Sequence, residues 1–166
     1  MGFTAAGILH TTVSNESSAG ADDASQLAPL GFILTVPDGD NGAQEWIYVK
    51  NTDTSDMSVV GTIVGRAAGS ATYQVITCPT SETTARVVGV VQHTIGRNGY
   101  GFVLRKGVGT VLIDTGVSAN AGLQVGNGTA GRADAAGGAL THPTFGLSLA
   151  AIGTGETGNA HFNCLG

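Results

Sequence analysis

Short apolar runs separated by turn residues fill the chain from residue 31 onward. They are rich in valine, isoleucine, threonine and aromatic residues, the side chains that favour strands. The runs read GFILTV, EWIYVK, SVVGTIV, TYQVIT, RVVGVVQ, YGFVLR, VGTVLI, GLSLAAI and AHFNCL. No window of about 12 residues keeps a helical period without a glycine, so we expect at most one short helical turn. The pattern predicts an all-β domain of antiparallel hairpins over residues 31–166, either a small barrel or a β-tulip-like sandwich.

Two of these runs place large side chains on one face. Trp46 and Tyr48 share a face of the run EWIYVK, because side chains two residues apart in a strand point the same way. Tyr100, Phe102 and Leu104 share a face of the run YGFVLR for the same reason. Aromatic residues make up only 5% of the chain, so few large groups are present to fill a core of small aliphatic side chains. We therefore predict that these five residues form part of the structural core, with Trp46 and Phe102 mostly buried.

Asn-Gly pairs mark three of the predicted turns, at residues 41–42, 98–99 and 127–128. Tight hairpins need residues with positive φ, and Asn and Gly adopt that conformation most readily. We expect a hairpin turn at each pair.

A glycine pattern at residues 126–131 has the spacing of a dinucleotide-binding turn. Gly126, Gly128 and Gly131 fit G-x-G-x-x-G after a short apolar run, and in that motif the glycines let the backbone approach a pyrophosphate. The chain holds 27 glycines in 166 residues, more than twice the usual ~7%, so the spacing arises easily by chance. A dinucleotide site also needs a full helix after the glycines, and Gly137 and Gly138 interrupt that segment. We interpret the motif as a turn between short strands and expect no cofactor.

A weak internal echo links two of the predicted hairpins. The spacing G-x5-I-G begins at Gly89 ahead of the run FVL, and again at Gly146 ahead of the run FNCL. In both places a strand leaves a glycine, turns through a glycine-rich loop and returns as an apolar strand. Two similar hairpins in one barrel would explain the echo, as would chance in a chain so rich in glycine.

Residues 1–30 differ in composition from the rest of the chain. They are small and polar, with SNESSAGADDASQ at their centre, and by composition such a segment buries too little apolar surface to fold alone. We predict an extended N-terminal arm over residues 1–30, which lies on a neighbouring chain or wraps on its own domain. The β domain then covers residues 31–166.

Charge and cysteine content narrow the classes of partner. The formal net charge is −5, and the seven basic residues form no basic stripe that would displace counterions from phosphates, so we expect no nucleic acid. No apolar run approaches the ~18 residues of a membrane span, so we expect no membrane partner. Cys78 and Cys164 are far apart, and we expect two buried free thiols, because cysteine packs as a small apolar side chain.

Residue types that carry catalysis or bind metals form no recognisable motif. No serine or cysteine has the local signature of a nucleophile. The stretch DGDNG at residues 38–42 resembles the start of a calcium loop, but its twelfth position is Val49 instead of Glu, and we favour a hairpin turn over a loose calcium site. We expect no catalytic residue and no metal site, and therefore a protein that binds or builds instead of an enzyme. The histidines also lack the spacing of a metal site: His10, His93, His142 and His161.

The densest group of positive charges consists of Arg97, Arg105 and Lys106. Three cations are too few for a nucleic-acid site, which needs many phosphate contacts. We interpret the group as a surface or interface feature.

Three stretches resemble segments of certain tailed-bacteriophage virion proteins. EWIYVKN at 45–51 is similar to a strand that often reads G-x-E-W-x-Y-V in those proteins. ARVVGVVQHTIGRNGYGFVLRKGVGTVLI at 85–113 is similar to their R-V-G-V-x-Q segment, which continues through Asn and Tyr-Gly-aromatic-Val to a glycine-bounded strand. SANAGLQVGNGTAGRADAA at 118–136 is similar to their continuation through a strand and a small turn to A-G-x-x-D. Together the three stretches span most of residues 45–136.

In order and spacing these stretches resemble the phage capsid decoration, or cement, proteins and related small head proteins. The resemblance implies a non-catalytic structural virion protein whose small β-barrel or β-tulip domain binds the outer surface of the capsid. The implied partner is the major capsid protein, and the implied oligomer is often a trimer. A receptor- or glycan-binding head appendage on the same scaffold is an alternative, as is another shell or tail subunit. Exposed Trp46, Tyr48 or Tyr100 beside a polar groove would favour the appendage, and their burial would favour decoration.

Overall fold

The computed structural model describes residues 26–39, 41–69, 73–80, 86–137 and 144–165. These residues form ten strands and no α-helix, which confirms the predicted all-β class for the described part of the chain. The strands are β1 (Ile33–Gly39), β2 (Gly42–Asn51), β3 (Ile63–Arg66), β4 (Gln74–Thr77), β5 (Val87–Val90), β6 (Tyr100–Leu112), β7 (Gly122–Val125), β8 (Ala133–Ala135), β9 (Gly146–Ser148) and β10 (Thr157–Asn163). The described residues include no helix of the length and apolar character that a membrane crossing requires.

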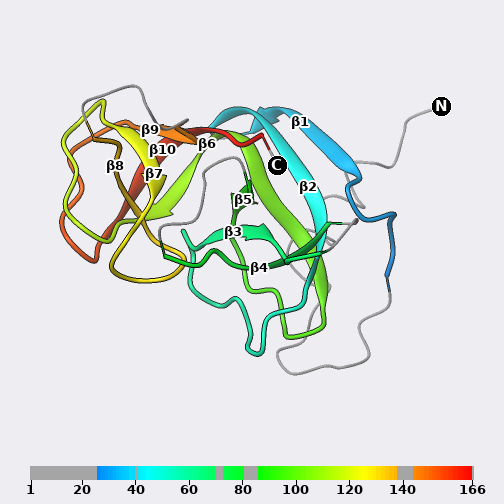
Figure 1. Cartoon of the computed structure of the whole chain (residues 1–166). Helices are drawn as coiled ribbons and strands as arrows, with labels where there is room; N and C mark the ends of the chain where they lie inside the picture. The colour runs from blue at the N-terminus through cyan, green and yellow to red at the C-terminus, as the bar shows by residue number, and fades with distance from the viewer. Residues whose placement is uncertain (1–25, 40, 70–72, 81–85, 138–143, 166) are drawn as a thin grey trace.

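Strand β6 belongs to two closed rings of strands. The first ring runs β2-β4-β3-β5-β6 and closes because β2 pairs with both β4 and β6. The second runs β6-β10-β9-β7-β8 and closes through an isolated parallel bridge between Ile113, just after β6, and Ala133 in β8. Figure 1 shows β6 extending from the green strands of the first ring to the yellow and orange strands of the second. The predicted small barrel is therefore a pair of barrel-like rings that share one strand.

The closure of the rings is uneven. Strands β5 and β6 of the first ring pair only at Val90 and Leu104, and the second ring depends on its single bridge. The strand pairs are antiparallel except for β2 with β4, so the predicted hairpin architecture holds across the described residues.

Gly107 lies where β6 passes from one ring to the other. The residues of β6 up to Lys106 pair with β2, and those from Lys106 to Leu112 pair with β10. The φ angle of Gly107 is 105°, and a Cβ atom there would lie 2.7 Å from the carbonyl oxygen of Ala43. Only glycine fits a backbone with that angle and that neighbour, so the glycine in the run RKGVGTV is a requirement of the shared strand.

The two rings repeat the same chain path. In each ring an opening strand is followed by a hairpin, which is β3–β4 in the first ring and β7–β8 in the second. The next strand, β5 or β9, pairs with the first strand of that hairpin. A final strand (β6 or β10) then pairs with the opening strand (β2 or β6). The G-x5-I-G echo occupies corresponding places in the two paths, because Ile95 forms a bridge with Met57 and Ile152 forms one with Val117.

The echoed turns also pack in the same way. A Cβ atom on Gly101 would lie 2.9 Å from Cγ1 of Ile95, and one on Gly158 would lie 2.5 Å from Cγ1 of Ile152. In each ring the isoleucine of the turn fills the space left by a glycine on the returning strand. The echo in the sequence therefore marks two structurally equivalent hairpins.

Two clusters of buried apolar side chains form the core. Strands β3 and β5 contribute to both clusters, with Ile63 and Val87 in one and Val64 and Val88 in the other. A strand that is buried on both faces is apolar at successive positions, which explains the continuous run VVGVV. Both cysteines belong to the cluster that includes Phe145 and Phe162, and both are buried free thiols, as predicted.

The Asn-Gly pairs behave in two ways. Gly42 has a φ of 77° in the β1–β2 hairpin, and Asn98 has a φ of 59° in the turn before β6, as predicted. The predicted hairpin at 127–128 is present as β7–β8, but its positive φ of 76° falls on Gly131 instead. The loop is longer than a two-residue turn because the backbone N–H groups of residues 127–129 bind aspartate side chains.

Residues 26–32, here called the strap, connect the N-terminal segment to the domain through Tyr48. The backbone N–H of Leu27 donates to the Tyr48 hydroxyl at 3.1 Å, and that of Gly31 donates to the Tyr48 carbonyl at 2.8 Å. The ring of Phe32 contacts that of Phe102 edge-on, with centroids 6.5 Å apart. Residues 1–25 of the predicted arm lie outside the described residues.

Candidate binding surface

The loop that carries the G-x-G-x-x-G spacing binds a carboxylate of the protein itself. The backbone N–H groups of Gly128 and Thr129 donate to Oδ2 of Asp114 at 2.8 and 3.0 Å. Partial desolvation acts to raise the pKa of Asp114, but hydrogen bonds from Thr129 and Gly128 and the charge of Arg132 outweigh it and lower the pKa below its usual value. The amides that a pyrophosphate would use are bonded to Asp114, which supports the interpretation of this loop as a turn.

Each glycine of that spacing meets a local constraint. A Cβ atom on Gly126 would lie 2.9 Å from the carbonyl oxygen of Arg132, and one on Gly128 would overlap the Asp114 carboxylate. Gly131 has the positive φ of the loop. The three glycines are therefore explained by close backbone approach and turn geometry.

Of the two histidines in the described ranges, His93 is the more enclosed, and its ring is bonded to the backbone. Nε2 of His93 lies 2.8 Å from the carbonyl oxygen of Phe102, and burial lowers the pKa of His93 against the opposing effect of its hydrogen bonds. His161 is exposed on β10. Within the described ranges no three His, Cys, Asp or Glu side chains are grouped so that they could hold a metal ion. Three residues considered in the sequence lie outside those ranges: His10, Asp40 and His142.

The five predicted core residues meet across the β2–β6 ladder. Tyr48 lies opposite Phe102, and Trp46 lies opposite Leu104. The ring of Tyr48 also stacks on Tyr100, with centroids 6.1 Å apart. Alternation placed each set on one face of its own strand, and the tertiary structure brings the two faces together.

These residues differ in burial. Tyr48, Phe102 and Leu104 are at most 4% exposed, whereas Trp46 and Tyr100 are half-buried. Trp46 is less buried than the sequence predicts because it lies near the hairpin end of β2, where the preceding residues are themselves exposed or half-buried. Among these aromatic rings, Tyr48 and Phe102 are covered, and only Trp46 and Tyr100 keep part of their surface exposed.

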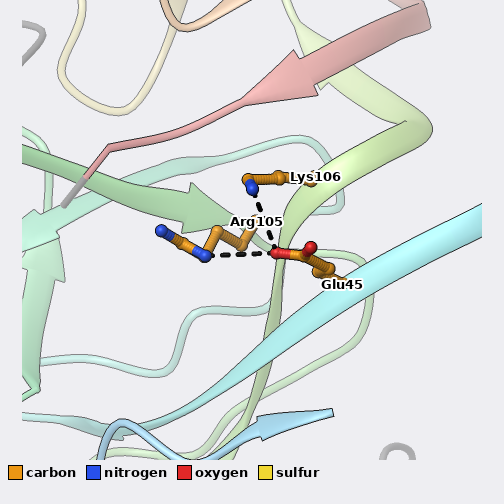
Figure 2. A network of polar contacts seen from close by, with 3 residues as sticks. All are labelled: Glu45, Arg105 and Lys106. Atoms are coloured by element: carbon orange, nitrogen blue, oxygen red, sulfur yellow. Dashed lines mark hydrogen bonds and ion pairs between the residues drawn. The ribbon is translucent and has the colours of Figure 1, made fainter. Parts of the chain in front are cut away.

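The fold separates the predicted group of positive charges. Arg97 lies in the turn before β6, where its backbone N–H donates to Asp56 at 2.7 Å. Arg105 and Lys106 lie at the other end of the β2–β6 ladder and face Glu45. Nη1 of Arg105 is 3.1 Å and Nζ of Lys106 is 3.4 Å from the same oxygen, Oε2 of Glu45 (Figure 2).

Glu45 is the member of this group that no local sequence pattern reveals. It directly precedes Trp46, and its pairing with Lys106 across the ladder depends on a register irregularity between Glu45 and Trp46. A cation pair 60 residues away gives no local signal for such a partner. The available hint in the sequence was the acidic residue Glu45 at the start of the apolar run EWIYVK.

A pocket with a volume of about 440 Å³ opens beside Glu45 and Lys106. It lies where the two rings meet, because Lys106 pairs with Glu45 of β2 and with Asn163 of β10. Figure 2 shows the ion pairs between β2, drawn in cyan, and the green strand β6, with the pink strand β10 beside them. The lining residues are Thr35, Ala43, Gln44, Glu45, Lys106, Gly107, His161, Phe162 and Asn163.

Large apolar side chains are exposed at several places on the described surface. Three of them, Leu27, Phe32 and Ile33, belong to the strap and the start of β1. Exposed apolar side chains that gather on a surface are typical of contact sites for other proteins. The others are Val59, Val60, Leu147, Leu149 and Leu165.

Comparison with solved structures shows a protein of similar fold. No protein-family model matches the chain, and no curated protein matches it. The structure is similar to a solved one described as the head fiber gp8.5 N base in bacteriophage phi29, with a TM-score of 0.51 and 10% sequence identity. The match covers 70% of this chain and 93% of that chain. At this identity the similarity shows a shared fold.

Proposed function

We propose that this protein is a non-catalytic structural virion protein that binds the outer surface of a phage capsid and stabilises the shell. The observation that carries the proposal is the all-β fold shared with the base of a phage head fiber over nearly the whole of that chain. The three stretches that resemble capsid decoration proteins support the same class independently, because they rest on sequence order and spacing. The partner in this proposal is the major capsid protein.

Stabilisation in this role follows from linkage. A protein that binds the assembled lattice but not its free subunits adds its binding free energy to the stability of the shell. Closed symmetric oligomers are the commonest assemblies of soluble chains, and we propose a trimer placed on a symmetry axis of the shell. The exposed apolar side chains of the strap and β1, such as Leu27, Phe32 and Ile33, are candidate contacts.

The alternative is a head appendage that carries a receptor- or glycan-binding function. The match to the base of a head fiber favours an appendage on the phage head, without indicating what that appendage binds. Tyr48 is fully covered and is therefore excluded as a sugar platform, whereas Trp46 and Tyr100 are half-buried and do not separate the two functions. Decoration is the preferred function because the three sequence stretches resemble decoration proteins, and attachment to the head is common to both functions.

The test is reconstitution on particles. Purified protein is added to expanded capsids that lack it, and bound protein is measured by co-sedimentation and located by electron microscopy. We expect saturable binding to the outer surface at a fixed copy number, together with a higher temperature of shell disruption. Binding to cells or glycans without binding to capsids would favour the receptor function, and binding to neither would refute both.

A further inference from the structure

We propose that the pocket between β2, β6 and β10 binds a carboxylate group, presented by an acidic side chain of the capsid subunit. The choice of partner rests on the proposed function, whereas the choice of carboxylate rests on the pocket itself. The residues that line the pocket include Lys106, Thr35 and Asn163, whose side chains carry an ammonium, a hydroxyl and an amide group. Glu45 also lines the pocket, and its carboxylate is already paired with Arg105 and Lys106.

The charges beside the pocket do not balance. Two cations, Arg105 and Lys106, contact a single carboxylate oxygen of Glu45, which leaves an excess of one positive charge. Lys106 is the most exposed of the three side chains, at 41% against 20% for Arg105 and 31% for Glu45. It is also the cation that lines the pocket. An incoming anion therefore meets Lys106 first.

Hydrogen-bond donors also exceed acceptors in this group. Nε of Arg105 is buried and has no acceptor among the described residues. The side-chain amide of Gln44, by contrast, already donates to the carbonyl oxygen of Val108 at 2.6 Å. Arg105 does not line the pocket, whereas Glu45 and Lys106 do. An entering carboxylate, which supplies acceptors only, therefore meets the ammonium of Lys106, a group with three donor hydrogens whose ion pair with Glu45 is 3.4 Å long.

The net charge of the group formed by Glu45, Arg105 and Lys106 is opposite in sign to the formal net charge of the whole chain. The chain has a formal net charge of −5, and Arg105 and Lys106 are its only consecutive basic residues. Two of the other cations are engaged with rings, Lys50 over Tyr100 and Arg66 over Tyr73. An acidic group on a partner is attracted to the local excess of positive charge at Arg105 and Lys106, which favours one orientation of the partner over others.

The size of the pocket limits the ligand. A volume of about 440 Å³ lies within the range of small-ligand sites. It admits one or two side chains and their carboxylates but not a folded element. The ligand is therefore an exposed acidic residue, on a loop or at the end of a chain.

The first experiment tests the pocket without the capsid. The full chain is labelled with ¹⁵N and titrated with a capped triglutamate peptide at low salt, with a capped triglutamine peptide as the control ligand. We expect saturable amide shifts at residues 106–107 and 161–163 with triglutamate only. The shifts should vanish in Lys106→Gln and persist in Lys50→Gln, the matched lysine at the opposite end of the same ladder. Absence of saturable shifts there, or equal shifts in Lys106→Gln, would overturn the carboxylate site.

The second experiment tests the partner. Binding to capsids that lack the protein is measured for the wild type, Lys106→Gln and Lys50→Gln at low and high salt. We expect Lys106→Gln to bind about fivefold more weakly at low salt, a difference that salt screening reduces, and Lys50→Gln to bind within about twofold of the wild type. Equal capsid binding by Lys106→Gln overturns the capsid as the source of the carboxylate. If the wild type binds no capsid, the proposed function fails, while the peptide titration still decides the pocket.

Discussion

The carboxylate of Asp114 accepts the backbone N–H of Gly128 at 2.8 Å, and the backbone N–H of Asp114 donates to the carbonyl oxygen of Ala133 at 2.8 Å. One residue thus joins the end of β6 to the loop of the β7–β8 hairpin and to strand β8. The ring-closing bridge between Ile113 and Ala133 is its direct neighbour. Asp114 therefore helps to close the second ring.

Replacing Asp114 by Asn should loosen the 126–132 loop and lower the melting temperature at neutral pH. The amide offers a weaker acceptor to Gly128 and Thr129 and removes the attraction to Arg132. We expect faster hydrogen exchange at the amides of residues 128 and 129. Glu156→Gln is the control for the loss of one negative charge in the same ring, and it should leave those amides unchanged.

The contribution of Asp114 should depend on pH in one direction. Its pKa in the folded state lies below the usual value of 3.8, so the folded state binds this proton less readily than the unfolded state does. The stability from Asp114 is present above pH 3.8 and is lost as the pH falls through the lower folded pKa. The difference in melting temperature between wild type and Asp114→Asn should be constant near neutrality and shrink in acid. A difference that grows on acidification would contradict this assignment.

Phe102→Ala should destabilise the protein more than Trp46→Ala. Phe102 is 4% exposed and contacts Tyr48 and Phe32, so its truncation should cost about 3–5 kcal/mol in the free energy of unfolding. Trp46 is half-buried, so its truncation removes less buried contact. Urea denaturation of both variants measures the difference. A Trp46→Ala variant with unchanged stability and lost binding to a sugar would support the glycan-binding alternative.

Gly101→Ala and Gly158→Ala should both destabilise, for the same reason. The added methyl group would lie within 3 Å of Ile95 in one hairpin and of Ile152 in the other. Gly137→Ala is the control, because a Cβ atom there has no heavy atom within 4 Å, and the substitution should be neutral or slightly stabilising.

A double-mutant cycle tests the cause. Ile95→Ala removes the side chain that the new methyl group meets, so Gly101→Ala should cost less in that background than in the wild type. Costs that simply add would show that Ile95 is not the obstacle. The same cycle with Gly158 and Ile152 tests whether the two hairpins are energetically equivalent.

Neither cysteine should react with thiol reagents in the folded protein. Burial raises the pKa of Cys164 to about 12, against a lowering by Arg105, so the thiol stays protonated at pH 8. Cys78 is also fully buried. We expect no labelling by a chromogenic disulfide reagent in buffer and labelling of both thiols in denaturant. Fast labelling of one thiol in buffer would indicate local opening of the core cluster.

The N-terminal arm should be protected only on the particle. If residues 1–30 lie on a neighbouring chain, limited proteolysis should cut within them in the free protein and not in the capsid-bound protein. The region near Leu27 should be cut last, because its backbone N–H is bonded to Tyr48. Equal protection in both states would mean that the arm packs on its own domain.

Local sequence features determined the strands, the turns and the side chains that share a face. The alternation at Trp46 and Tyr48 depends only on the period of a strand, and the turn at Asn98 uses the readiness of asparagine to adopt a positive φ. The G-x5-I-G echo marked two equivalent hairpins because the packing of a turn isoleucine over a nearby glycine needs only a short stretch of chain.

The tertiary structure decided everything that depends on register between distant strands. That β6 serves two rings follows from its pairing with β2 on one side of Gly107 and with β10 on the other, and neither pairing is encoded by a local pattern. The same holds for the contacts of Glu45 with Lys106 and of Asp114 with Gly128. A shift of one residue in register turns a side chain to the opposite face, so such pairs exist only once the cores of both rings have selected the register.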